Sequence, residues 1–219
     1  MELIHAVYEP AGAGPHPTLI ALHGWGANAL DLLGLAPHLG DGNLLVLCPQ
    51  GPIEVPIGPG MNGYGWFPIT MGEPPDPVAF ARSVGSLDAF ITEARQRYPI
   101  DTQRLVVLGF SQGGVMAYAL ALRHGRGLAA VAALSTWFAP GLGAMGAAPL
   151  AGLPVLVQHG TRDELIEVAR GRESVEALRA AGADVRYREY EMGHEISGES
   201  LRDLVDFLDE QLGSRIVLA

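Results

Sequence analysis

The sequence predicts an α/β fold in which a mostly parallel central sheet is covered by helices on both faces. Short apolar runs alternate with segments of helical periodicity along all 219 residues. Hydrophobic residues make up 48% of the chain, which suits a globular core and is too high for a disordered protein. The sequence shows no internal repeat and no linker, so we expect one domain over residues 1–219.

Each element follows from its local pattern. The expected strands are the short apolar runs, in chain order Leu3–Tyr8, Thr18–Leu22, Leu44–Cys48, Arg104–Phe110, Ala129–Leu134, Val155–Gln158 and Asp184–Tyr190. The expected helices are Leu30–His38, Pro77–Tyr98, Gln112–Arg123, Glu167–Ala181 and Glu199–Leu212. In the last helix the apolar residues recur at spacings of three and four, and the aspartates at 203, 206 and 209 fall on other faces, where we expect solvent.

Two long segments need separate interpretation. Gly51–Pro77 is rich in glycine and proline, and a loop of that length in a compact domain is usually functional or disordered. Gly127–Val157 carries no charge and is long enough to cross a bilayer, but prolines and glycines interrupt it repeatedly. We therefore expect two buried strands joined by an apolar loop rather than a transmembrane segment.

Composition excludes several classes of protein. The net charge is −10, and all 14 basic residues are arginine, so we expect no nucleic-acid partner. A single cysteine, Cys48, excludes an internal disulfide framework. The first residues lack the basic and apolar regions of a secretory signal, so a cytoplasmic location is expected.

The motif Gly109-Phe110-Ser111-Gln112-Gly113 stands between a predicted strand and a predicted helix. A nucleophile elbow needs this placement, because its serine occupies a sharp strand-to-helix turn that only small neighbours permit. The helix N-terminus behind the serine favours developing negative charge. Ser111 is therefore the candidate nucleophile, although a glycine-rich structural turn gives the same string.

A serine hydroxyl needs a base to take its proton. In this fold the chain order is serine, then acid, then histidine. His124 is expected at a helix end, where it interacts with carbonyls. His159 leaves no acid between itself and the serine. His194 follows the last predicted strand, at the sheet edge where open α/β folds build their sites, and is the candidate base.

The acid and the oxyanion donors come from other loops after strands. Asp163 follows Val155–Gln158 by a short loop and is expected to orient His194, with a solvated loop carboxylate as the alternative. The backbone N–H groups of Gln112 and Trp25 are the candidate oxyanion hole. His23, beside Trp25, is expected to orient or pack rather than act as a second base.

These motifs together resemble the phospholipase/carboxylesterase family of α/β-hydrolases, which includes acyl-protein thioesterases and small bacterial carboxylesterases. The resemblance rests on five segments in order: Leu22–Gly26, Trp66-Phe67, Gly109–Gly114, His159–Asp163 and Tyr190–His194. It implies an α/β-hydrolase fold, the triad Ser111, Asp163 and His194, an oxyanion hole at Trp25 and Gln112, and hydrolysis of esters or thioesters without a cofactor or metal.

Two positions differ from the thioesterase branch, which usually has an aspartate after the second glycine of the His-Gly loop and an acidic residue after the Trp-aromatic pair. Here Ala27-Asn28 follow Gly26, and Pro68 follows Phe67. We therefore expect a serine carboxylesterase acting on short- to medium-chain esters, with a lysophospholipase or acyl-protein thioesterase as the first alternative. A slow or non-catalytic small-ligand binding protein is the second.

The Gly51–Pro77 segment supplies the candidate substrate-binding residues Met61, Tyr64, Trp66 and Phe67. They either form a wall of an apolar acyl pocket or anchor the loop to the core. A cysteine nucleophile, as in dienelactone hydrolases, is disfavoured because Cys48 has no elbow around it. Metal-dependent hydrolysis is disfavoured because no histidine pair has helical ligand spacing.

Overall fold

The computed structural model describes residues 3–70, 73–144 and 150–213. Within these residues, seven strands form the main sheet in the order β1-β3-β2-β6-β7-β8-β9. They are β1 (His5–Tyr8), β2 (His16–Leu22), β3 (Leu45–Pro49), β6 (Ile100–Phe110), β7 (Ala130–Leu134), β8 (Pro154–Gly160) and β9 (Asp184–Tyr190). Only β1 runs antiparallel to its neighbour, so the expected mostly parallel sheet is confirmed.

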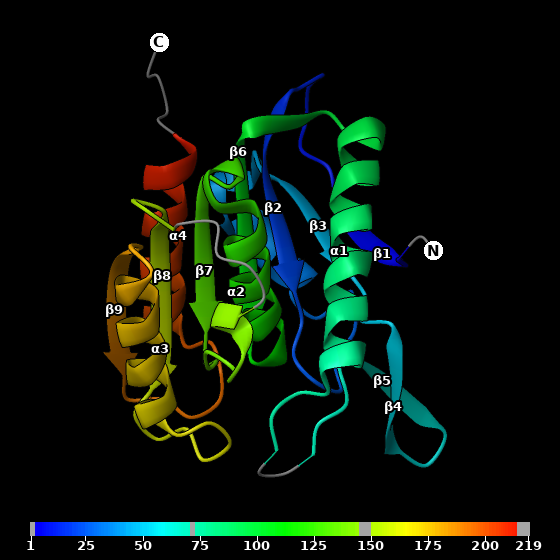
Figure 1. The fold of residues 1–219 in the computed structure, drawn as a ribbon. Helices are drawn as coiled ribbons and strands as arrows, with labels where there is room; N and C mark the ends of the chain where they lie inside the picture. Colours follow the sequence, from blue (N-terminus) through cyan, green and yellow to red (C-terminus); the bar gives the residue numbers. More distant parts are fainter. Residues whose placement is uncertain (1–2, 71–72, 145–149, 214–219) are drawn as a thin grey trace.

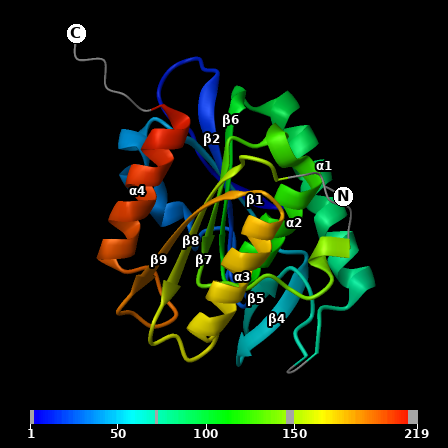
Figure 2. The same cartoon turned by 60° about the vertical axis from the view of Figure 1, so that its left-hand side comes forward.

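Helices cover both faces of this sheet (Figures 1 and 2). One face carries α1 (Pro77–Arg97), α2 (Gln112–His124) and α3 (Val168–Ala180), and the other carries α4 (Gly198–Leu212). Short 3-10 turns lie at Leu33–His38, Gly40–Gly42, Gly125–Gly127 and Leu142–Ala144.

The core divides into two clusters because side chains alternate across the pleated strands. In β6, Leu105 and Val107 contribute to the cluster under α1, α2 and α3, whereas Val106 and Leu108 contribute to the cluster under α4. All four side chains are at most 1% exposed. The apolar runs that predicted the central strands, such as β3 and β7, are therefore continuous because these strands are buried from both sides.

The structure contains a β-hairpin that was not predicted from the sequence, and one predicted α-helix does not form. Within the expected loop Gly51–Pro77, β4 (Ile53–Gly58) pairs antiparallel with β5 (Met61–Gly65). The expected helix Leu30–His38 is wrong: only a 3-10 turn forms over Leu33–His38. Pro37 lies inside that turn and lacks the N–H that a regular α-helix needs.

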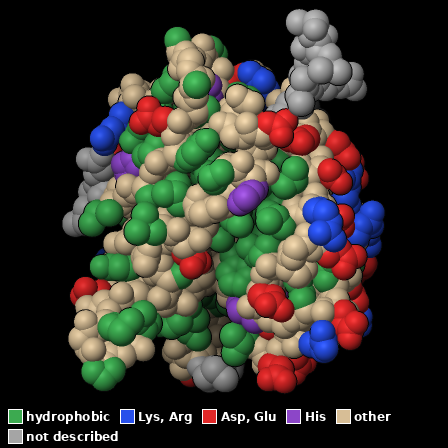
Figure 3. Space-filling view, turned by 180° about the vertical axis from the view of Figure 1, so that it is seen from behind, with side chains coloured by type: hydrophobic (Ala, Val, Ile, Leu, Met, Phe, Trp, Pro, Cys, Tyr) green, Lys and Arg blue, Asp and Glu red, His purple; other side chains and the backbone are tan. Residues whose placement is uncertain are grey.

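The apolar segment Gly127–Val157 contains the two buried strands β7 and β8, as expected, with residues 145–149 between them outside the described part. In the described ranges, no helix is long and apolar enough to cross a bilayer. On the face seen from behind, acidic and arginine side chains gather over β9 and α4 (Figure 3), where Arg186 pairs with Glu210 at 2.6 Å. This charged surface is of mixed sign.

The parallel strands point their carboxyl ends toward the end of the molecule that carries the β4–β5 hairpin (Figure 1). Loops that follow those ends build the functional sites of open α/β sheets. The hairpin itself is covered by few neighbours at its tip, where Ile57 and Met61 are 52% and 60% exposed.

Candidate active site

Ser111 occupies the sharp turn between β6 and α2. Its backbone has φ 53° and ψ −121°, in a region that residues with a side chain rarely adopt. Small neighbours make the turn possible: a Cβ on Gly109 would lie 2.2 Å from the Gly113 carbonyl oxygen, and a Cβ on Gly113 would lie 2.0 Å from that of Leu22. The elbow geometry that the motif predicts is therefore present.

Hydrogen bonds to the neighbouring strand hold Ser111 in this conformation. The Ser111 N–H donates to the Leu134 carbonyl at 2.9 Å, and the Thr136 hydroxyl donates to the Ser111 carbonyl at 2.7 Å. Ser135 between them also has a positive φ of 46°, which turns the chain at the end of β7 and brings Thr136 beneath the elbow. Thr136 was missed in the sequence, although its position after a buried strand was a usable signal.

His194 and Asp163 meet at the carboxyl end of the sheet. His194 Nδ1 lies 2.8 Å from Asp163 Oδ2, and the carboxylate also accepts the N–H groups of Leu165 and Ile166 on Oδ1, at 3.0 and 2.8 Å. Because an ionised carboxylate only accepts hydrogen bonds, Nδ1 carries the proton and Nε2 is the basic nitrogen. The ring packs on Phe110, the residue that precedes Ser111, with ring centroids 4.9 Å apart.

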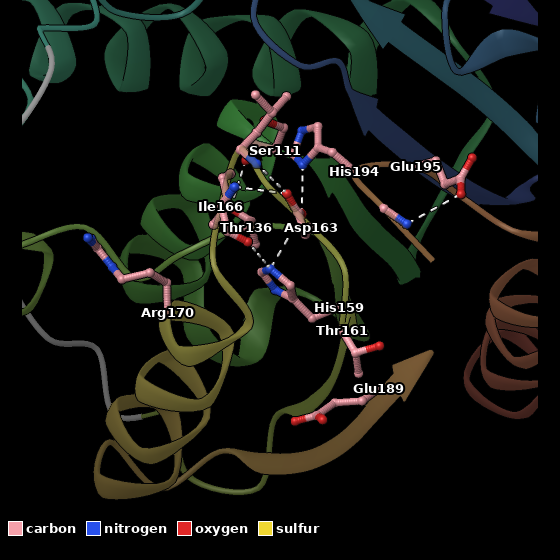
Figure 4. Close-up of polar contacts among 12 residues, drawn as sticks. Ser111, Thr136, His159, Thr161, Asp163, Ile166, Arg170, Glu189, His194 and Glu195 are labelled. Carbon is pink, nitrogen blue, oxygen red and sulfur yellow. Dashed lines mark hydrogen bonds and ion pairs between the residues drawn. The ribbon is translucent and has the colours of Figure 1, made fainter. Parts of the chain in front are cut away.

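His159 lies on the other side of the acid. Its ring is fully buried, its Nε2 is 2.7 Å from the Ile166 carbonyl oxygen, and the same nitrogen is 3.5 Å from Asp163 Oδ2. His159 therefore pins the loop that presents Asp163 and does not serve as a second base for Ser111 (Figure 4). Glu164, the adjacent carboxylate, is exposed.

The Gly24-Trp25 turn borders the serine. A Cβ on Gly24 would lie 3.3 Å from Ser111 Cβ, so the two backbones approach closely. The Trp25 N–H makes no hydrogen bond to any residue that the structure describes. Gln112 is the first residue of α2, and the first N–H groups of a helix have no acceptor within it. Two N–H groups are thus free to donate beside Ser111.

His23 packs beneath this turn, as expected. Its Nδ1 donates to the Gly24 carbonyl at 2.7 Å, while its Nε2 accepts the Gly51 N–H at 2.9 Å. Burial lowers the pKa of His23, in keeping with this neutral tautomer. Its role is to hold the turn.

A cleft of about 540 Å³ opens near the site, with mostly apolar walls and three charged residues. Its lining residues are Phe67, Pro68, Ile69, Thr70, Glu73, Pro74, Pro75, Trp137, Pro140, Leu165, Ile166, Glu167 and Arg170. Three connections tie this cleft to the elbow and to Asp163: the Gln112 amide donates to the Phe67 carbonyl at 2.7 Å, Ile166 donates its N–H to Asp163, and Trp137 follows Thr136.

The four expected substrate-binding residues occupy different environments. Trp66 is fully buried and Phe67 is 2% exposed, so both anchor the segment to the core, and Phe67 also reaches the cleft. Met61 is on the exposed hairpin tip, and Tyr64 is half-buried where it bridges to Ala27. Neither Met61, Tyr64 nor Trp66 lines the cleft.

His124 and two aspartates of α4 have environments that differ from those expected from the sequence. His124 does not bind carbonyls: its Nε2 is 2.7 Å from Asp88 Oδ1, because the end of α2 packs beside α1. Asp209 does not simply face solvent, since its Oδ1 is buried with no hydrogen-bond partner among the described residues, and burial raises its pKa. Asp203 accepts the Tyr190 hydroxyl at 2.7 Å. None of these groups contacts Ser111.

Two other kinds of chemistry, a cysteine nucleophile and a metal site, can be examined in the described residues. Burial raises the pKa of Cys48 to about 12, so its thiol stays protonated. Within the ranges that the structure describes, no cluster of three or more histidine, cysteine or acidic side chains is arranged to hold a metal ion.

Comparison with known proteins places this geometry among related chains. A family model described as Phospholipase/Carboxylesterase matches residues 4–212. A Gibberella zeae protein named acyl-protein thioesterase 1 is 30% identical, covering 93% of this chain and 94% of its own, and one of the same name from Mycosarcoma maydis is 28% identical, covering 91% and 93%.

Two solved structures that this chain resembles are also named as esterases. The crystal structure of esterase PE8 superposes with a TM-score of 0.85 at 26% identity, covering 97% of this chain and all of that one. The Bacillus cereus carboxylesterase superposes with a TM-score of 0.81 at 26% identity, covering 95% and 94%. The neighbours share the α/β-hydrolase fold, so that expectation is confirmed.

Proposed function

Since the chain belongs to the phospholipase/carboxylesterase family and is an ester-hydrolysing enzyme of the serine hydrolase type, we propose that it is a carboxylesterase acting through an acyl-enzyme on Ser111. The observation that carries this proposal is the hydrogen bond between His194 Nδ1 and Asp163 Oδ2, beside a serine in a strained elbow. It supports an imidazole whose other nitrogen is ready to take the serine proton.

In the proposed cycle, His194 Nε2 removes the Ser111 hydroxyl proton while Oγ attacks the ester carbonyl carbon. The carbonyl oxygen becomes an oxyanion and accepts the Trp25 and Gln112 N–H groups. The C–O bond to the alcohol then breaks, and the alcohol leaves with the proton from His194. Water enters, gives a proton to the same imidazole and attacks the acyl carbon. The bond between that carbon and Ser111 Oγ then breaks, Oγ takes the proton back from His194, and the acid is released.

We propose short- to medium-chain acyl groups as the substrate class. The cleft that adjoins the elbow is mostly apolar near Phe67 and Ile166 but contains Glu73, Glu167 and Arg170. Apolar walls favour an alkyl chain, whereas charges that keep their hydration oppose deep burial of a long one. A small neutral ester is therefore the proposed ligand, with no nucleic-acid partner.

The second candidate is a long-chain thioesterase or lysophospholipase. The observation that favours it is the name shared by the two fungal relatives, acyl-protein thioesterase 1, at 28% and 30% identity over nearly their whole length. The same nucleophile, base and oxyanion donors would serve a thioester, because the tetrahedral oxyanion is the same. Acyl length and leaving group therefore distinguish the two candidates.

The test combines one substitution with one substrate series. Ser111→Ala is expected to lower p-nitrophenyl ester turnover by several orders of magnitude, because the triad acts as a unit, and to abolish labelling by a fluorophosphonate probe. Ser86→Ala, in α1 and away from the site, is the matched control and should keep full turnover. Esters from acetyl to palmitoyl, with a thioester included, measure the preference.

The outcomes are distinct. Turnover of the Ser111→Ala protein near the wild-type rate would overturn the serine mechanism. A sharp preference for long thioesters would replace the carboxylesterase by the thioesterase. Probe labelling with negligible turnover of every ester would favour the slow ligand-binding protein.

A further inference from the structure

We infer that the segment Tyr64–Phe67, here called the strut, fixes the spacing between the two oxyanion N–H donors, and that the Gln112 side chain is the positioning residue that attaches the strut to the elbow. This inference rests on the proposed function, because it takes the Trp25 and Gln112 N–H groups as the donors. It concerns the Gln112 side chain, whose role is separate from that of its own backbone N–H.

The first end of the strut is bound to the Trp25 turn. The Gly26 N–H donates to the Tyr64 carbonyl at 2.8 Å, and the Tyr64 N–H donates to the Ala27 carbonyl at 2.7 Å. This pair forms an antiparallel bridge between Ala27 and Tyr64, outside the main sheet. The backbone that carries the Trp25 N–H is therefore part of a small ladder with the strut.

The second end is bound to the elbow by a side chain. Gln112 is completely buried. Its Oε1 accepts the Trp66 N–H at 2.7 Å, and its Nε2 donates to the Phe67 carbonyl at 2.7 Å. One amide thus pairs with two consecutive residues of the strut, so its position defines both the distance and the orientation of that backbone.

A third connection ties the strut to the strand that leads into the Trp25 turn. The Trp66 indole N–H donates to the His23 carbonyl at 2.9 Å, and His23 in turn accepts the Gly51 N–H at the start of the hairpin. Ser83 of α1 donates its hydroxyl to the Trp66 carbonyl from the other side. Because Trp66 is fully buried, these polar groups have no water to replace a lost partner.

Two glycines of β5, of which Gly65 also belongs to the strut, permit the close fit. A Cβ on Gly63 would lie 1.8 Å from the Gly26 carbonyl oxygen, so that backbone packs directly on the Trp25 turn. A Cβ on Gly65 would lie 2.4 Å from the Trp25 ring and 3.3 Å from Gln112 Oε1. Gly63 thus brings two backbones into contact, and Gly65 brings the strut backbone against the Trp25 ring and the Gln112 amide.

The chemical consequence is specific to the transition state. The two donors come from loops that are far apart in sequence, at residues 25 and 112, and an oxyanion needs both at hydrogen-bond distance at once. Displacement of one donor weakens the bond to the developing oxyanion more than it weakens substrate binding. Loosening the strut therefore lowers kcat and leaves KM nearly unchanged.

The experiment loosens each end of the strut separately. Gln112→Met keeps the size of the side chain and the backbone N–H but removes both bonds to residues 66 and 67. Gly63→Ala pushes directly on the Gly26 backbone at the other end and should lower the unfolding midpoint, so its kinetics are measured well below that midpoint. Gly58→Ala is the matched control on the same hairpin, because its Cβ would meet Met61 only at an ordinary 3.9 Å. Circular dichroism and thermal unfolding verify that each protein is folded.

We expect both strut variants to lower kcat for a p-nitrophenyl ester by about 10- to 100-fold, as a small misplacement of a catalytic group does. KM should stay within about twofold of the wild-type value. The inhibition constant of an alkylboronic acid, whose tetrahedral adduct places an oxygen in the oxyanion hole, should rise in proportion. The acid limb of the kcat/KM pH profile should not move, because His194 and Asp163 are untouched. Gly58→Ala should match the wild type.

Wild-type kcat in a folded strut variant would overturn the inference, as would a rise in KM alone. If Gln112→Met does not fold, Gln112→Glu replaces it, since it keeps an oxygen for the Trp66 N–H and replaces the donor to the Phe67 carbonyl by a second oxygen. Ser111→Ala separates this failure from failure of the proposed function: an inactive Ser111→Ala protein beside a fully active Gln112→Met protein refutes the strut and leaves the serine mechanism intact.

Discussion

Asp163→Asn is expected to inactivate the enzyme by reversing the tautomer of His194. Oδ1 of the carboxylate accepts two backbone N–H groups, from Leu165 and Ile166, so the amide oxygen of the new side chain will take that position. The amide NH2 must then face His194 Nδ1, where Oδ2 accepts a hydrogen bond at 2.8 Å. An NH2 group only donates here, so Nδ1 must become the acceptor and the ring proton moves to Nε2.

The size of the effect follows from that proton. With Nε2 protonated, the imidazole cannot accept the serine proton, and catalysis falls to what the oxyanion donors and binding supply. Loss of the correct tautomer in a serine triad costs about 10,000-fold in kcat, which corresponds to about 5 kcal/mol of transition-state stabilisation. Stability should change little, because the two backbone donors keep their acceptor; we expect less than about 2 kcal/mol.

The measurement is kcat/KM for a p-nitrophenyl ester at neutral pH, with the unfolding midpoint recorded in parallel. Glu164→Gln is the matched control, since it removes a neighbouring but exposed carboxylate and should leave kcat/KM unchanged. A folded Asp163→Asn protein with activity within about tenfold of the wild type would refute the assigned tautomer and the role of the acid.

Two further predictions concern stability. Because burial lowers the pKa of His23, the folded protein binds a proton there less readily than the unfolded chain does. The free energy of unfolding should therefore fall as pH drops below about 6.5. His23→Gln keeps an acceptor for the Gly51 N–H and should flatten this pH dependence in urea titrations. Gly109→Ala should lower the free energy of unfolding by more than about 4 kcal/mol, because its Cβ meets the Gly113 carbonyl oxygen at 2.2 Å. Gly85→Ala in α1, with open space around it, should raise that free energy by about 0.5–1 kcal/mol in the same denaturation assay. Equal unfolding midpoints for the two variants would contradict the close approach at Gly109.

The central strands could be predicted because they are buried from both sides, so that β2, β3, β6, β7 and β8 each contain an apolar run. β9 is predicted with its bounds at Asp184–Tyr190, and α2 differs from the predicted helix only by one residue at its end. The order of motifs along the chain also predicts which loops meet, because the carboxyl ends of parallel strands share one edge of the sheet.

The β4–β5 hairpin could not be predicted from local pattern. Its strands contain Pro56, Gly58 and Gly63, residues that usually disfavour strand structure. The hairpin is stabilised by its partners, above all the bridge from Tyr64 to Ala27 and the Gln112 side chain. The Pro59-Gly60 turn between the strands was the one local signal.

The same reasoning explains why the supporting residues of the site were missed. Thr136 and the Gln112 amide act on backbone carbonyls of residues that are distant in sequence, at positions 111 and 67. A motif identifies the residue that reacts, because reactive groups are few. It does not identify the residue that holds the reactive backbone in place, because hydroxyl and amide side chains are common and only their partners distinguish them.

The two departures from the thioesterase branch fall at positions with different structural roles. Ala27 joins the strut through its backbone carbonyl, and Asn28 closes its own turn by accepting the Leu30 N–H at 2.8 Å. Neither contact depends on an aspartate, so the change at this loop leaves the bridge between the Trp25 turn and the strut intact. Pro68, in contrast, lines the cleft. If the cleft binds the acyl group as proposed, the difference at Pro68 bears on acyl length, and the acyl-length series is the measurement that tests it.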